Sequence, residues 1–451
     1  MPPSIALLLC IFVILYLFFI DQKTGVESSK ALWIPLTWMF LTSSRYVSQW
    51  LNLGAPIISE DVYIDGNPVD RFIFLCLLIA GACILLKRKI DWYKLVSGNI
   101  WIWLFFLFCL LSISWSDYSF VSFKRWIKAL GDLIMTLIIL TEDHPYEALG
   151  VVLRRLAYVL LPLSVLFIKF YPELGRAYHM GIPMFTGVAL QKNGLGQICL
   201  ITGLYFSWDL LLYRRQSQEL RHRLHYSIYF LILPMLLWLF YMANSVTSLV
   251  CIFIVLCIFL AGRQPMILQK PSRILCIGVT LLVSSLLLEY LFDISDSILY
   301  LLGRDSTLTT RTQIWSEILG MVTNPLLGTG FESFWLGPRM TYIWDRYGDI
   351  IQAHNGYIDI YINIGLVGLG LLIGCIVSGS VKAYRTLHCD YLPAMLRISF
   401  IMAVIAYNFT EASIKPLNNT FILLLIGLID TPLVINDTAP LLRWAGPPDR
   451  Q

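Results

Sequence analysis

Long runs of apolar residues recur along the whole chain and constrain its fold more than any other feature. Roughly 20 apolar residues in helical form cross a bilayer, and unpaired backbone groups are not tolerated in hydrocarbon. About 13 runs approach this length, near residues 4–20, 31–51, 69–86, 98–114, 121–140, 152–171, 187–212, 226–242, 245–261, 273–292, 355–379, 394–411 and 418–435. The 451 residues are 57% hydrophobic and only 14% charged. We therefore predict an all-α, polytopic integral membrane protein with about 12–13 transmembrane helices.

The first apolar run is predicted to remain as a membrane span. No basic residue precedes Ile5 and no small-residue cleavage site follows Ile20, whereas a secretory signal peptide has both. Nine of the ten cysteines lie in apolar segments, and their spacing matches neither a zinc site nor a disulfide framework. They are predicted to be small apolar packing residues, and no metal site is expected.

Basic residues in the short loops predict the orientation of the chain. They fall in loops that share one side of the predicted bundle: Lys87, Arg88, Lys89, Lys94, Arg214, Arg215, Arg221, Arg223, Arg263, Lys270, Arg273, Lys382 and Arg385. The positive-inside rule makes this side cytoplasmic. The loop 52–68, which has no Lys or Arg, and the polar stretch 293–353 then lie on the opposite, extracytoplasmic side.

One long polar stretch interrupts the apolar runs and divides the chain into three predicted parts. Residues 1–292 are expected to form an N-terminal transmembrane bundle. Residues 354–451 are expected to form C-terminal transmembrane helices with a short cytoplasmic tail. The loop 293–353 between them is predicted to carry short amphipathic helices and the chemistry, because long loops in compact proteins are usually functional.

A helix of about three turns is predicted inside this loop, with one apolar face that would lie along a membrane surface. Its apolar positions are Ile314, Trp315, Ile318, Leu319 and Val322. Thr310 and Gln313 have capping-box spacing, which places Arg311 in the first turn. An arginine there opposes the helix dipole, but it could hold an anion that the free N–H groups already attract. The turn after the helix contains Gly328 and Gly330.

His354 opens the next apolar run and is the predicted general base, because histidine transfers protons near neutral pH. His179 is the second candidate on the same side. At helical spacing, Asn355, Asp359 and Asn363 form one polar stripe, and the first two are predicted to orient the imidazole. Asp359 has the alternative role of a hydrogen-bonding group inside the bundle. Other candidate bases in the loop are Glu332, Asp345 and Asp349.

Several basic residues lie on the extracytoplasmic side, against the positive-inside bias. Cations inside or at the end of a span carry a desolvation cost. As a set they predict a bound anion, most simply a phosphate. The alternative for each of them is snorkelling to the lipid headgroups. The candidate anion-binding residues are Arg45, Lys124, Arg125, Lys128, Lys192 and Arg304.

Three motifs in the polar stretch resemble those of a known family. They read Arg304-Asp305-x-Thr307-Leu308-Thr309-x-Arg311-Thr312-x-Ile314-Trp315, Asn324-Pro325-Leu326-Leu327-Gly328-x-Gly330-x-x-x-Phe334 and His354-Asn355-x-Tyr357. In this combination the sequence resembles the O-antigen ligase/polymerase superfamily, and within it the exopolysaccharide polymerases of succinoglycan type. Supporting matches at Ser44-Arg45, Trp115-Ser116 and Lys192-Asn193 extend the resemblance over most of the chain.

The resemblance implies a GT-C-like glycosyltransferase that crosses the bacterial inner membrane several times, with a periplasmic active site. Members use undecaprenyl-diphosphate-linked saccharides and need no metal, and we expect no cofactor. Carried over residue by residue, the catalytic residues are His354 and Arg311. One departure is the turn Ser245-Val246-Thr247, where the family often has a basic residue at the position of Val246. One phosphate contact is therefore absent or supplied from elsewhere.

We predict an inverting transfer that polymerises exopolysaccharide or O-antigen repeat units, with the anion-binding residues holding the donor diphosphate. An O-antigen ligase, which transfers polysaccharide to the lipid A core, is the alternative. A lipid-saccharide transporter or flippase is less favoured, because its polar residues would extend through the whole membrane depth. A non-catalytic scaffold would need none of these cations. Expected partners are the lipid-linked saccharide, a glycan acceptor, the lipid bilayer and other polysaccharide assembly or export proteins, but no nucleic acid.

Overall fold

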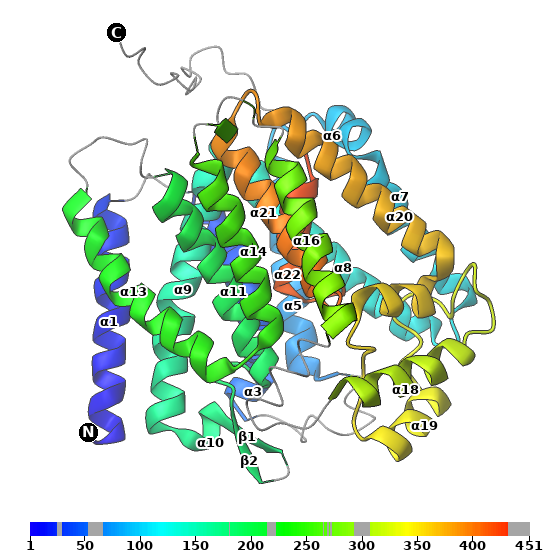
Figure 1. Cartoon of the computed structure of the whole chain (residues 1–451). Helices are drawn as coiled ribbons and strands as arrows, with labels where there is room; N and C mark the ends of the chain where they lie inside the picture. Colours follow the sequence, from blue (N-terminus) through cyan, green and yellow to red (C-terminus); the bar gives the residue numbers. More distant parts are fainter. Residues whose placement is uncertain are drawn as a thin grey trace.

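Helices make up almost all of the regular structure in the described part of the chain, as predicted (Figure 1). The computed structural model describes residues 1–24, 29–52, 66–179, 181–213, 222–264, 266–267, 270, 273–292 and 307–431. Five of the described helices are long and apolar enough to cross a membrane. They are α1 (Pro3–Thr24), α5 (Pro68–Lys87), α9 (Pro145–Phe170), α11 (Lys192–Trp208, continued by the π-turn Asp209–Tyr213) and α20 (Gly356–Thr386). The chain is therefore a multi-pass, all-α membrane protein.

The other apolar runs form helices that are shorter, bent or more polar than a simple span. Shorter apolar helices are α13 (His222–Ala243), α14 (Val246–Gly262), α21 (Tyr391–Tyr407) and α22 (Asn419–Leu428). A bend of 85° separates α6 (Trp92–Gly98) from α7 (Ile100–Leu111) and its continuation η2 (Ser112–Trp115). The remaining runs contain η1 (Lys30–Leu32), α2 (Trp33–Ser43), α3 (Val47–Trp50), α8 (Ser119–Leu140) and α16 (Arg273–Phe292). Hydropathy located each run, but it did not detect the breaks that shorten some helices.

Within the residues that the structure describes, a short β-hairpin is the exception to the helical fold. Strand β1 (Arg176–His179) pairs in antiparallel fashion with β2 (Ile182–Phe185), so that Arg176 lies opposite Phe185. The hairpin follows α10 (Pro172–Gly175) and lies at the lower end of the bundle in Figure 1, near α3. The two helices α18 (Thr307–Gly320) and α19 (Pro338–Tyr347) lie at the same end, whereas α6 and the last described residues lie at the opposite end (Figure 1).

One hydrophobic core joins the first and last parts of the chain. It extends from Ala6 in α1 to Ile429, just after α22. All ten residues of α22 are buried, and this helix packs against α8, α20 and α21. The helices of segments 1–292 and 354–431 therefore share one core, because the C-terminal helices lie between the N-terminal ones.

A second, smaller core anchors α18 to the bundle. Ile314 and Ile318 of α18 are buried with Phe334, Trp335, Ile343, Ala353 and Ile362, and the Trp315 indole donates a hydrogen bond to the Ala353 carbonyl (2.7 Å). The apolar face of α18 thus packs against protein, and the prediction that it lies on a membrane surface is wrong. The helix also begins at Thr307, which places Arg311 in its second turn and away from the free N–H groups.

The glycine-containing turn before α19 fits into a break in α20. The backbone of α20 is non-helical at Ile364 and Gly365, and this frees backbone groups that pair with the turn. Thr329 N–H donates to Ile362 O (3.1 Å) and Gly330 N–H to Asn363 O (2.8 Å). Gly328 and Gly330 have φ angles of +68° and +99°, and a Cβ on Gly328 would lie 2.5 Å from the Asn363 backbone. Only glycine allows this close approach without strain.

Candidate active site

A large cavity opens among the ends of α2, α5, α8 and α20. Its volume is about 1160 Å³, and its walls include Trp38, Phe74 and Trp335. The described residues that line it include six basic ones, namely Arg45, Arg71, Lys124, Arg125, Lys128 and Lys415. The acidic lining residues are Asp70, Glu332 and Asp359. Basic side chains therefore outnumber acidic ones in the described lining of the cavity.

The first turns of α8 bring three of these cations together. Lys124, Arg125 and Lys128 occupy positions i, i+1 and i+4 of the helix, and all three line the cavity. Arg125 Nη1 donates a hydrogen bond to the Glu332 carbonyl (2.6 Å), and Lys124 Nζ lies 5.0 Å from the centre of the Phe120 ring. Arg45, which also lines the cavity, donates to the Leu174 carbonyl. Four of the six predicted anion-binding residues thus line one cavity.

A buried carboxylate fixes the geometry of the cavity wall. Asp132 of α8 is fully buried. One of its oxygens accepts a hydrogen bond from the Trp38 indole of α2, and the other accepts from the Leu417 N–H, both at 2.8 Å. Asp132 therefore links α2, α8 and the segment before α22. This contact positions Lys415 and Leu417 in the cavity lining.

Beside the cavity, a cluster forms around Glu411, whose side chain is only 7% exposed. His354 Nδ1 lies 3.3 Å from Glu411 Oε2, and Arg311 Nη2 lies 3.8 Å from Oε1. Asn193 donates a hydrogen bond to the same Oε1 (2.6 Å), while Arg311 also donates to the Thr410 carbonyl (3.0 Å). The two predicted catalytic residues thus meet at one carboxylate that the sequence analysis did not identify. We name these four residues, Glu411, His354, Arg311 and Asn193, the Glu411 cluster.

A hydrogen-bonded path joins this cluster to the cavity. Lys415, which lines the cavity, donates to Gln352 Oε1 (2.7 Å). Gln352 Nε2 lies 3.3 Å from His354 Nδ1. Gly356 and Ala412, close neighbours in sequence of His354 and Glu411, line the cavity, whereas His354 and Arg311 do not. The Glu411 cluster therefore lies next to the cavity wall.

Asn355 and Asp359 fix the backbone on the two sides of His354 and do not contact its ring. Asn355 caps α20 by accepting from Tyr357 N–H (3.0 Å). Asp359 accepts from the Ala353 N–H (3.1 Å) and from the Trp335 indole (2.9 Å). The side chains next to Nδ1 are those of Glu411 and Gln352, so Asn355 and Asp359 would orient the imidazole only through the backbone.

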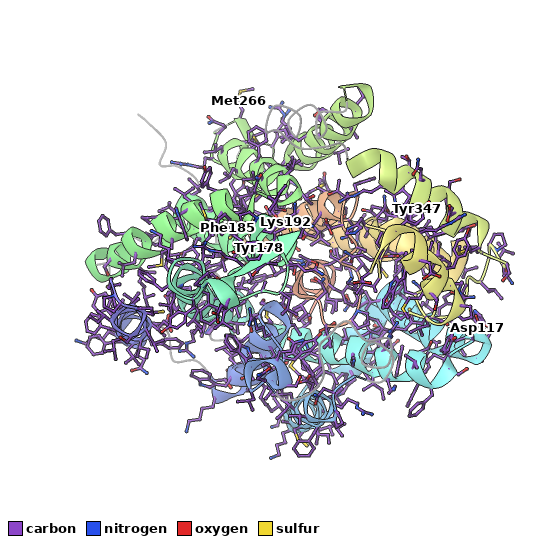
Figure 2. The ribbon with its side chains drawn as sticks, turned by 90° about the horizontal axis from the view of Figure 1, so that it is seen from below. Asp117, Tyr178, Phe185, Lys192, Met266 and Tyr347 are labelled. Carbon is purple, nitrogen blue, oxygen red and sulfur yellow. The ribbon has the colours of Figure 1, made fainter. Side chains whose placement is uncertain are left out.

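The other predicted residues are more scattered. Lys192 begins α11 beside Asn193 and is not among the residues that line the cavity. Seen from the lower end of the bundle, it lies near Tyr178 and Phe185 of the hairpin (Figure 2). His179 is in β1, and Asp345 and Asp349 are exposed and line no part of the cavity. Arg304 lies outside the described residues.

Sequence analysis missed Glu411 and Lys415 because hydropathy assigned the first to the apolar run 394–411. A usable signal was present in the polar stretch Thr410-Glu411-Ala412-Ser413-Ile414-Lys415, which separates two apolar runs.

The turn Ser245-Val246-Thr247 lies close to this stretch, because the Thr247 hydroxyl is 2.6 Å from that of Thr410. Arg311 donates to the carbonyl of this same Thr410. A guanidinium from α18 therefore lies beside the turn in which Val246 replaces the usual basic residue.

Comparisons with known proteins show two similarities. A family model described as O-antigen ligase matches residues 230–373, a range that contains Arg311 and His354. The exopolysaccharide production protein ExoQ of Rhizobium meliloti (strain 1021) is 27% identical over 317 residues. This match covers 63% of the present chain and 66% of that relative. Together with the three motifs, these similarities show that the chain is similar to the O-antigen ligase/polymerase family of membrane proteins.

Proposed function

We propose that this protein is a GT-C-type glycosyltransferase that polymerises exopolysaccharide repeat units from an undecaprenyl-diphosphate-linked donor. The observation that carries the proposal is the cavity lined by Arg45, Lys124, Arg125 and Lys128, with the Glu411 cluster at its wall. The similarity to an exopolysaccharide production protein supports the same class of reaction.

The cavity cations would bind the diphosphate of the donor. A diphosphate leaves readily once fixed positive charges neutralise the charge that develops on it, and preorganised cations do this without rearrangement. Arg311 is less suited to this task than the sequence implied, because it lies close to the Glu411 carboxylate. We assign it instead to holding Glu411 and Thr410 in place. Leu75 and Leu78 of α5 add apolar side chains to the cavity lining. The lipid chain of the donor would leave the cavity beside them.

His354 would take the proton from the acceptor hydroxyl. If Nδ1–H donates to Glu411 Oε2, the lone pair of Nε2 is left to act as the base. The acceptor oxygen then bonds to the anomeric carbon while the bond from that carbon to the phosphate oxygen breaks. Both electrons of the broken bond leave with the diphosphate, and the hydroxyl proton moves to Nε2. Attack from the face opposite the diphosphate inverts the anomeric configuration.

The active site would face the periplasm of a bacterial inner membrane. The helix α6, which contains Lys94 and follows the basic loop after α5, lies at the end of the bundle opposite α18 and α19 (Figure 1). The positive-inside rule assigns the end near α6 to the cytoplasm. The opposite end, where α18 and the cavity lie, would then be reached by lipid-linked saccharides from the periplasmic leaflet.

An O-antigen ligase is the second candidate, and the description of the matching family model favours it. Donor binding and proton transfer would be the same in both enzymes. The difference lies in the acceptor, which is another lipid-linked repeat unit for a polymerase and the lipid A core for a ligase.

The experiment uses purified full-length protein and lipid-linked saccharides extracted from source cells in which the gene is deleted. We expect wild type to extend these saccharides. His354→Ala should lower the rate about 10²- to 10⁴-fold, the usual contribution of a general base. Lys128→Gln should also lower the rate. Lys94→Gln, at an exposed lysine of α6, serves as a charge-matched control and should not. Transfer to lipid A core without extension would favour the ligase, and full activity of His354→Ala would remove the assigned base.

A further inference from the structure

One carboxylate in the cavity has no role in the mechanism above. Glu332 lines the cavity together with Lys124, Arg125 and Lys128, and it is half-buried between the buried residues Phe331 and Ser333. Among the described residues, none forms a hydrogen bond or an ion pair with its carboxylate. The neighbouring acid Asp359 is different, because it is bonded to Ala353 N–H and to the Trp335 indole.

The backbone around Glu332 is held in place on every side. Phe331 N–H donates to Ser112 Oγ (3.0 Å), Ser333 N–H to the Gly330 carbonyl (3.1 Å) and Phe334 N–H to Asn363 Oδ1 (3.0 Å). Arg125 binds the carbonyl of Glu332 itself. The surrounding structure therefore fixes the position from which the Glu332 side chain enters the cavity.

This position also has an unfavourable backbone conformation for glutamate. The φ angle of Glu332 is +54°, in the left-handed region that glycine adopts freely and glutamate rarely adopts. Strained residues of this kind are concentrated at binding and catalytic sites. A carboxylate here is also unfavourable for the binding of a diphosphate, because the two negative charges repel. Both observations indicate that the carboxylate has a use other than stability or phosphate binding.

We propose that Glu332 accepts hydrogen bonds from hydroxyl groups of the saccharide attached to the donor diphosphate. An ionised carboxylate is a strong acceptor for hydroxyl donors, and here it lies in the same cavity as the cations that would hold the diphosphate. The bound saccharide must lie within a few bonds of that diphosphate. Glu332 would thus contact the substrate and select the sugar. This inference rests on the proposed function.

Two substitutions separate this role from a structural one. Glu332→Gln keeps the shape of the side chain and removes its charge. Glu332→Gly removes the side chain and the backbone strain, so that its thermal midpoint should be unchanged or higher than that of wild type. Glu317→Gln is the matched control, because Glu317 pairs with Arg346 on α18 and α19 and does not line the cavity.

The measurement is the affinity of purified full-length protein for two probes, bare undecaprenyl diphosphate and the lipid-linked saccharides extracted from the deletion strain. Wild type should bind the saccharide-bearing lipid more tightly. Glu332→Gln and Glu332→Gly should bind it about 10- to 100-fold more weakly, while binding bare undecaprenyl diphosphate as well as wild type or better. The KM for the saccharide-bearing donor should rise correspondingly, and Glu317→Gln should match wild type.

The outcomes are distinguishable. If both Glu332 variants retain the extra affinity for the saccharide, Glu332 does not contact it and the inference is overturned, although the proposed function stands. A Glu332→Gly variant that unfolds at a lower temperature, with Glu332→Gln fully active, would show a purely structural role and also overturn it. If wild type binds neither lipid and transfers no saccharide, the proposed function itself fails.

Discussion

His354 owes its position to residues on both sides of it. Its φ angle is +51°, in the left-handed region that histidine enters more readily than most side chains. Asp359 holds the Ala353 N–H before it, and the Asn408 carbonyl accepts from the Gly356 N–H after it (2.8 Å). The backbone therefore presents the ring to Glu411. At the residue scale, the proposed active site pairs an imidazole with a carboxylate.

Replacing that carboxylate tests the arrangement. Glu411→Gln removes the charge that favours the proton on Nδ1, so the rate of saccharide transfer should fall at least about tenfold, in line with other carboxylate–imidazole pairs. Glu411→Asp keeps the charge, so its transfer rate should lie between those of Glu411→Gln and wild type if the shorter side chain still reaches the ring. Transfer rates and thermal midpoints of the purified variants provide the measurement. A fully active Glu411→Gln would show that His354 needs no charged partner.

At the scale of elements, the break in α20 matters more than the helices themselves. Ile364 and Gly365 interrupt the helix, and the turn with Gly328 and Gly330 occupies the break. The same turn leads directly to Phe331 and Glu332 in the cavity wall. The glycine motif therefore supports the candidate site through backbone packing.

Adding one methyl group should disturb this junction. Gly330→Ala places a Cβ about 2.5 Å from Ser116 Cβ at a φ angle of +99°. Left-handed strain of about 1–2 kcal/mol and overpacking of about 1–3 kcal/mol should together lower the thermal midpoint by several degrees. Gly320→Ala is the control, because a Cβ there meets nothing within 4 Å. Equal midpoints for the two variants would contradict the close packing.

Over the whole molecule, the two ends of the bundle carry different features. The helices α18 and α19 lie at one end, and the short basic loops after α5 and α20 lie at the other (Figure 1). Helices from the beginning and the end of the chain share one core. The orientation of this single unit in the membrane therefore decides which leaflet supplies the substrate.

Cysteine labelling can test the orientation. In a variant that retains Cys389 alone among its cysteines, this exposed residue after α20 should react with a membrane-impermeant maleimide only after the membrane is permeabilised. A chain with Arg346→Cys, exposed on α19, as its single cysteine should react in intact spheroplasts. The reverse pattern would place the cavity on the cytoplasmic side and remove the periplasmic assignment.

Much of the fold and part of the candidate site followed from the sequence. The apolar runs predicted the helical membrane fold, and the displaced cations predicted four residues that now line one cavity. The start of α18 was misplaced, because Thr310 and Gln313 have capping-box spacing but lie inside the helix. The apolar face of α18 was assigned to the membrane surface. Hydrophobic periodicity shows that a face is buried, but it does not show whether lipid or protein covers that face.

Hydropathy and charge are properties of local sequence, and they alone determined that the chain crosses a membrane and where its unusual cations fall. Contacts between distant segments were decided only when the chain folded. Glu411 reaches His354 and Arg311, and Lys415 enters the cavity, because Asp132 and Asn408 hold the segment before α22 against α8 and α20. No local pattern specifies such a contact, since it depends on how several helices pack at the same time.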